Sequence, residues 1–150
     1  MVGRFKKIIT NPKPEGFKPD ALQRRAANPK KSIWLTASAG SGKTKVLTDR
    51  VLTLLLGGTS PEHILCLTFT KAAAAEMANR VNERLAEWAT MSAPILIEIL
   101  GKVLDRVPKS REVKRAQCLF AEVLDLPGGL NIQTIHSFCQ SLIARFPFES

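Results

Sequence analysis

The chain alternates between short apolar runs and longer segments in which apolar residues recur every three or four positions. Short runs bounded by turn residues are typical of strands, and the longer repeat is typical of amphipathic helices. Three short runs occur, and each is followed by a helical segment. In order, the pairs are 32–37 with 42–56, 63–69 with 70–90, and 130–135 with 136–146. This order predicts an α/β fold with a parallel sheet and right-handed crossovers, in which 32–37 is a buried strand.

Two further helical patterns interrupt the strand–helix repeat. They cover residues 93–107 and 110–126 and are separated by Pro108, which cannot continue a helix. Gly128 and Gly129 follow the second pattern, and glycines are common where helices end. The pair therefore predicts a helical segment, at about 92–127, inserted into the α/β core.

Charge is distributed unevenly along the chain. The net charge is +9, and residues 1–50 contain 12 Lys and Arg against three Asp and Glu, whereas residues 51–150 are balanced. Residues 1–19 combine prolines with lysines, which predicts a flexible basic lead-in. A basic surface attracts polyanions, above all nucleic acid. A solvated lysine-rich tail explains the same counts equally well.

Cysteine usage and hydropathy bear on the compartment. The three cysteines, Cys66, Cys118 and Cys139, form no C-x-x-C pair, which argues against a disulfide framework and fits a reducing environment. The first residues contain no apolar segment typical of a secretory signal, and the run LTLLL is too short to span a bilayer. We therefore expect a cytoplasmic protein that makes no membrane contact.

The segment ASAGSGKT, residues 37–44, lies between the first strand and its helix. It differs from the strict phosphate-binding loop G-x-x-x-x-G-K-[ST] only at its first position, which is Ala37. Gly40 and Gly42 let backbone N–H groups turn toward phosphate oxygens, and the helix directs its positive N-terminus at the same anion. The candidate nucleotide-binding residues are Ala37, Ser38, Ala39, Gly40, Ser41, Gly42, Lys43 and Thr44.

Two side chains in this loop have expected catalytic roles. Lys43 places a positive charge on the β- and γ-phosphates, and the Thr44 hydroxyl is the expected ligand of Mg²⁺. A loop of this kind does not by itself distinguish kinases, GTPases, transporters and motors. Other segments have to identify the class.

Three other segments occur in a characteristic order around the loop. They are LQRRAA at 22–27, LTFTKAAAAEMANRV at 67–81 and NIQTIHSFCQSLIARF at 131–146. Together with the loop they resemble the Q motif, motif I, motif Ia and the T-x-H segment of superfamily 1 helicases of the UvrD/Rep/RecB group. The last segment is especially similar to the AddA branch of that family. The resemblance covers about residues 19–150.

The resemblance implies a partial RecA-like P-loop NTPase domain that uses ATP and Mg²⁺. It implies the N-terminal part of an ATP-dependent DNA helicase of double-strand break repair and recombination, with single- and double-stranded DNA as partners and an AddB-like subunit beside the full-length protein. Gln23 would bind the adenine edge, since a carboxamide both donates and accepts. The residues implied to face single-stranded DNA are Phe69, Thr70, Lys71, Thr134, His136 and Phe138.

Each of these roles has a structural alternative. Gln23 is equally compatible with a surface position on a helix. Phe69 alternates with Leu67 and is compatible with a core position, and His136 is compatible with a helix cap.

The chain lacks a recognisable Walker B acid pair, which such motors need for Mg²⁺ and the attacking water. Glu98 and Asp125 are the nearest candidates, but both fit helical periodicity better than a strand. No arginine finger can be assigned, and a second motor domain would need far more chain. We therefore expect the N-terminal part of a first motor domain, inactive alone. A non-catalytic remnant and an unrelated P-loop ATPase or kinase are the alternatives.

Overall fold

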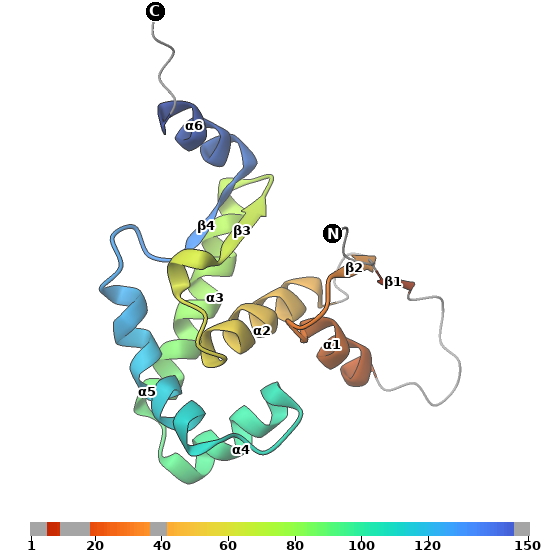
Figure 1. Ribbon diagram of the computed structural model, residues 1–150, viewed down its shortest axis with the longest axis vertical. Coiled ribbons are helices and arrows are strands. Elements are labelled where there is room, and N and C mark those ends of the chain that lie inside the picture. Colours follow the sequence, from red (N-terminus) through yellow and green to blue (C-terminus); the bar gives the residue numbers. More distant parts are fainter. Residues whose placement is uncertain (1–5, 10–18, 37–41, 146–150) are drawn as a thin grey trace, which may run out of the picture.

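A computed structural model describes residues 6–9, 19–36 and 42–145 of the chain. Figure 1 shows a helical molecule with α4 and α5 at its lower end and β3, β4 and α6 toward its upper end. The elements in chain order are β1 (Lys6–Ile9), α1 (Pro19–Ala27), β2 (Ile33–Thr36), α2 (Lys43–Leu56), the 3-10 turn η1 (Pro61–His63), β3 (Leu65–Thr68), α3 (Lys71–Thr90), α4 (Ala93–Leu104), α5 (Ser110–Leu124), β4 (Asn131–Thr134) and α6 (Ile135–Arg145).

The three strand–helix pairs expected from the sequence are confirmed as β2–α2, β3–α3 and β4–α6. Local signals explain their boundaries. Gly57 ends α2 and donates its backbone N–H to the carbonyls of the last turn. Thr70 begins α3 by accepting a hydrogen bond from the Ala73 N–H at 3.1 Å through its hydroxyl.

The strands form two small parallel sheets instead of the single sheet expected from their order. β1 pairs with β2, and β3 pairs with β4, each in parallel. Residues 6–9, expected to belong to a flexible lead-in, thus form a strand. In the part of the chain that the structure describes, no strand joins β2 to β3, so the two pairs stay separate. The fold is a mixed helix–strand arrangement with small parallel sheets.

The expectation that 32–37 is a buried strand is wrong for the side chains of β2. Trp34 is 63% exposed, and its indole N–H donates to the Thr36 hydroxyl at 3.0 Å. Leu65 and Leu67 of β3 are also exposed. A strand becomes buried on both faces only when helices cover both faces of its sheet. Among the described residues these short sheets lack such double cover.

The hydrophobic core lies among four helices. The helical segment expected at 92–127 forms α4 and α5, and these pack directly on α2 and α3. From the strands, Cys66 and Ile132 pack against this core but are only partly buried. The largest fully buried side chains are Leu52 and Leu55 on α2, Val81, Leu85 and Trp88 on α3, Leu96 and Leu100 on α4, and Leu119 on α5.

Polar contacts also join α5 to the helix that follows the glycine loop. Arg115 donates from Nε to the Leu55 carbonyl oxygen at 2.6 Å, near the C-terminus of α2. A cation at a helix C-terminus is favoured by the exposed carbonyls and the helix dipole. The α4–α5 pair therefore supports α2 through both apolar packing and a charged hydrogen bond.

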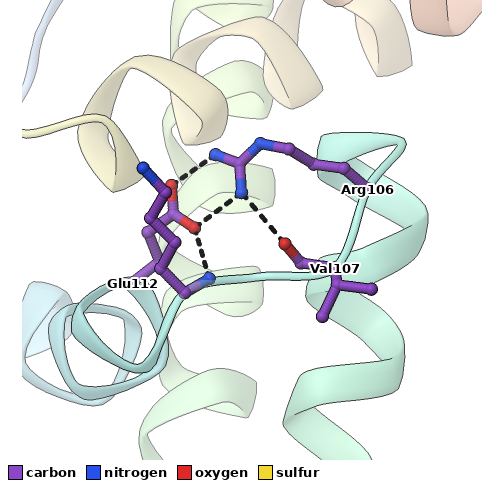
Figure 2. Close-up of polar contacts among 4 residues, drawn as sticks. Arg106, Val107 and Glu112 are labelled. Atoms are coloured by element: carbon purple, nitrogen blue, oxygen red, sulfur yellow. Dashed lines mark hydrogen bonds and ion pairs between the residues drawn. The ribbon is translucent and has the colours of Figure 1, made fainter.

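The connection between α4 and α5 is closed by a buried carboxylate (Figure 2). Arg106 donates to both carboxylate oxygens of Glu112, at 2.9 Å and 2.5 Å, and also to the Val107 carbonyl. The Lys109 backbone N–H donates to Glu112 at 2.7 Å, as in a capping box. Glu112 is 5% exposed. These donors lower the pKa of Glu112 to about 2, chiefly through the hydrogen bond from Arg106.

Glu112 should make the stability of the chain depend on acid pH. Because its folded-state pKa lies below the ordinary value of 4.5, its contribution is present above about pH 4.5 and is lost as pH falls toward 2. The pKa difference corresponds to at most about 3 kcal/mol. We expect Glu112→Gln to lower the free energy of unfolding at pH 7 by about 1–3 kcal/mol and to flatten its decline between pH 5 and 2.5.

Urea unfolding at several pH values measures this effect. Glu98→Gln is the matched control, because Glu98 also pairs with a cation, Lys102, but lies on the exposed face of α4. It should leave the pH profile close to that of the parent chain. Parallel profiles for the parent chain and Glu112→Gln below pH 5 would contradict the assignment.

Candidate nucleotide-binding site

The candidate site is built around the N-terminus of α2. Five of the proposed loop residues, Ala37, Ser38, Ala39, Gly40 and Ser41, lie outside the described residues. The remaining three, Gly42, Lys43 and Thr44, form the start of the helix and are partly buried.

Gly42 adopts the left-handed backbone conformation, with φ of 82°. Its carbonyl accepts the first helical hydrogen bond, from Val46 N–H at 3.1 Å. Glycine adopts this conformation without a steric penalty, whereas a residue with Cβ is strained. The backbone conformation at this position therefore explains why glycine precedes Lys43.

The electrostatics of the first turn of α2 suit an anion. The first turn contains no acidic residue and carries Lys43, while the helix N-terminus adds partial positive charge. Thr44 supplies a hydroxyl, an oxygen ligand of the kind that Mg²⁺ accepts in phosphate loops. The residues present are thus compatible with a phosphate group and an accompanying Mg²⁺.

Gln23 of α1 lies directly beside this turn. A Cβ added to Gly42 would stand 3.0 Å from Gln23 Nε2, closer than such atoms normally approach. Gln23 is half-buried, so it is not a freely exposed surface residue. Two motifs that are separate in the sequence thus meet at one point, with a carboxamide next to the predicted phosphate loop.

A cavity of about 370 Å³ extends from Gln23 across the neighbouring helices. It is open to solvent and has both charged and apolar walls, and Asp49 of α2 lies within it. Burial raises the pKa of Asp49, although Lys45 and Arg84 act in the opposite direction. Its lining residues are Gln23 and Arg24 of α1, Lys45 and Asp49 of α2, Arg84 of α3, and Ile99, Lys102 and Val103 of α4.

The candidate DNA residues gather at the carboxyl ends of β3 and β4. Thr68 is paired with Thr134 in the parallel register, so the segments that follow each strand leave the sheet at the same edge. Phe69 is 85% exposed, which excludes the core alternative for this residue. Lys71 and His136 are also exposed, and Phe138 is half-buried.

Two candidate DNA residues have structural partners already. The Thr70 hydroxyl caps α3. Thr134 is buried, and its hydroxyl accepts from the Ser137 N–H at 3.1 Å, which caps the start of α6. His136 follows that cap as the second residue of α6, so the capping role considered for it belongs to Thr134.

The structure does not bring the nucleotide and DNA candidates to one sheet edge. Lys43 follows β2, whereas Phe69 and His136 follow strands of the other sheet. Glu98 and Asp125 both lie on or next to helices, Glu98 in α4 and Asp125 at the end of α5, as their periodicity predicted.

Sequence reasoning missed Arg50, a residue of α2 that touches the neighbouring helix α1. Its guanidinium donates to the carbonyls of Ala26 at 3.3 Å, Asn28 at 2.7 Å and Lys31 at 2.8 Å. These acceptors lie 19 to 24 residues away. Periodicity contains no signal for such a contact, because it reports only which face of a helix is apolar.

Comparison with known proteins places the chain in a family. The family of the UvrD/REP helicase N-terminal domain matches residues 19–150. The chain belongs to this family. The resemblance drawn from the four motifs is therefore confirmed, and an unrelated P-loop ATPase or kinase is excluded.

The relatives of this UvrD/REP helicase domain include proteins named as the AddA component of an ATP-dependent helicase/nuclease. The one from Lactobacillus johnsonii is 38% identical over 116 residues, which are 77% of this chain and 8% of the relative. The one from Limosilactobacillus reuteri is 35% identical over 132 residues, 87% of this chain and 8% of the relative. The one from Bacillus cytotoxicus is 34% identical over 119 residues, with 77% and 8% coverage.

This UvrD/REP helicase domain thus spans about 8% of the length of its curated relatives. No solved structure matches the chain. Among the described residues, none of the helices is both long and apolar enough to cross a membrane.

Proposed function

We propose that this chain is the ATP-binding N-terminal segment of a motor domain in an ATP-dependent DNA helicase. The proposal extends to the helicase/nuclease named in its relatives, acting in double-strand break repair and recombination beside an AddB-like subunit. The observation that carries it is the contact between Gln23 and Gly42, because it joins a base-reading carboxamide to a phosphate-binding turn. This pairing is what an adenine nucleotide requires.

In this proposal the residues of α2 hold the phosphates and Gln23 holds the base. Lys43 supplies a positive charge to the β- and γ-phosphates, and the first N–H groups of α2 donate to their oxygens. Bound Mg²⁺, held by Thr44, would neutralise charge on the same oxygens. Gln23 both donates to and accepts from the adenine edge.

Single-stranded DNA is the second proposed ligand, bound at the shared edge of β3 and β4. Phe69 presents an exposed ring on which a base can stack, and Lys71 and His136 lie on the segments beside it. Thr70 and Thr134 support this surface by capping α3 and α6, so their effect on DNA is indirect.

Binding of a fluorescent single-stranded oligonucleotide tests the DNA proposal. We expect weak binding whose dissociation constant rises about tenfold between 50 and 200 mM salt, because phosphate contacts release counterions. Phe69→Ala should weaken binding further by about fivefold or more, through lost stacking.

Val107→Ala is the matched control for this experiment. Val107 is 82% exposed, close to the 85% of Phe69, but it lies at the α4–α5 connection, away from β3 and β4. Its replacement should leave DNA affinity unchanged. Equal losses for both variants, or an affinity insensitive to salt, would refute a specific DNA surface at this edge.

A non-catalytic remnant of the same family is the second candidate. It is favoured by one observation, the position of Glu98 and Asp125 on helices rather than after a strand. An in-frame continuation beyond Ser150 with an apolar strand and paired acids would decide for the motor.

A further inference from the structure

Helix α1 carries Gln23, and its attachment to the rest of the molecule is concentrated at its C-terminal end. Ala26 and Ala27 are buried against the neighbouring helices, 3% and 5% exposed. Among the described residues, α1 forms an ion pair through Arg24, which lies 3.3 Å from Asp105, and both side chains are well exposed. Exposed pairs of this kind contribute little to stability.

Arg50 supplies the strongest polar connection to this end of α1. One guanidinium reaches three backbone carbonyls, which belong to the last turn of α1 and to the segment that leads into β2. The carbonyls at a helix C-terminus have no partner within the helix, and they carry partial negative charge. A cation placed there both satisfies these acceptors and holds the direction in which the chain leaves the helix.

The geometry of the acceptors requires arginine. Nη1 serves Ala26 and Asn28 while Nη2 serves Lys31, so two nitrogens in a fixed plane are used at once. A lysine ammonium is a single point donor and cannot reproduce this fork. Burial also lowers the pKa of Arg50 below its ordinary value, as expected for a partly enclosed guanidinium.

Arg50 lies on the same helix as the glycine turn. α2 thus contacts α1 at two places, through the Gly42 turn beside Gln23 and through Arg50 at the C-terminal end of α1. Two contacts fix both the position and the direction of α1 relative to the phosphate-binding turn, whereas one would leave the helix able to pivot.

We propose that Arg50 is a positioning residue that holds α1 on α2 and so keeps the Gln23 carboxamide at the phosphate-binding turn, where it selects the base of the nucleotide. The part concerning the base rests on the proposed function. The part concerning α1 does not, because it follows from contacts made within the chain alone.

Hydrogen–deuterium exchange of the nucleotide-free chain tests the attachment of α1. In Arg50→Lys and Arg50→Ala the amides of residues 23–27 should exchange about tenfold faster, since the loss of charged hydrogen bonds favours local opening. The amides of α3 and α5 should exchange as in the parent chain. Arg111→Lys is the control, because Arg111 is an exposed arginine on α5. Unchanged exchange in α1 of Arg50→Ala would overturn the proposal.

Binding of Mg–ATP, Mg–GTP and inorganic tripolyphosphate tests the consequence for the base. Arg50→Lys should lower the affinity for ATP several-fold, reduce the preference for ATP over GTP and leave tripolyphosphate binding almost unchanged. Gln23→Ala should behave in the same way, and the double variant should lose no more than Gln23→Ala alone. A uniform loss for all three ligands would show that Arg50 acts only on general stability and would overturn the positioning role.

The two experiments separate the inference from the proposed function. Failure of the parent chain to bind any of the three ligands would refute the proposed nucleotide site, while the exchange experiment would still decide whether Arg50 holds α1. Faster exchange in α1 without a change in base preference would overturn the selection of the base by Gln23.

Discussion

Replacing Trp88 with alanine should lower the free energy of unfolding by about 3–5 kcal/mol, the range typical of large-to-small changes at buried aromatic positions. Trp88 is fully buried and lies in the core shared by α2, α3, α4 and α5. Domains of this size are stable by only about 5–15 kcal/mol, so the variant should retain little folded protein near 37 °C. Urea or thermal unfolding followed by circular dichroism measures the change.

Two other variants sharpen this test. Trp88→Phe should cost clearly less than Trp88→Ala, because it keeps most of the ring and because the indole N–H has no hydrogen-bond partner to lose among the described residues. Trp34→Ala is the matched control, since Trp34 is 63% exposed on β2 and should cost no more than about 1 kcal/mol. Similar losses at Trp34 and Trp88 would mean that the helical core is not the centre of stability.

Lys43→Ala should weaken binding of Mg–ATP by about 10- to 100-fold, the effect expected when a charge-assisted contact with phosphate is removed. Lys43 begins α2, beside Gly42 and at the positive end of the helix. Isothermal titration calorimetry, or the shift in unfolding temperature at saturating Mg–ATP, measures the loss. Lys114→Ala on the exposed surface of α5 controls for the change in net charge.

The same variant tests the expected lack of turnover by this chain. Because the sequence offers no Walker B pair, we expect Mg–ATP binding without hydrolysis stimulated by single-stranded DNA. DNA-stimulated hydrolysis that disappears in Lys43→Ala would contradict this expectation. Equal Mg–ATP affinity in the parent chain and Lys43→Ala would refute the nucleotide site itself.

Much of the candidate site could be predicted because its motifs are local. Gly42, Lys43 and Thr44 are adjacent in sequence, and their order before an amphipathic segment predicts a helix N-terminus that binds phosphate. The exposed position of Phe69 could not be predicted in this way. Its alternation with Leu67 fits a half-buried strand equally well, and only the placement of the strand in the sheet decides between these.

The sequence alone determined the order, type and approximate bounds of the helices and strands, because apolar periodicity, glycine and proline act over a few residues. The tertiary structure decided how these elements combine. It divided the strands into two sheets, placed the core among four helices, and brought Gln23 to Gly42. It also directed Arg50 to carbonyls as far as 24 residues away. Such contacts depend on the packing of whole helices against one another, and spacing along the chain does not specify that packing.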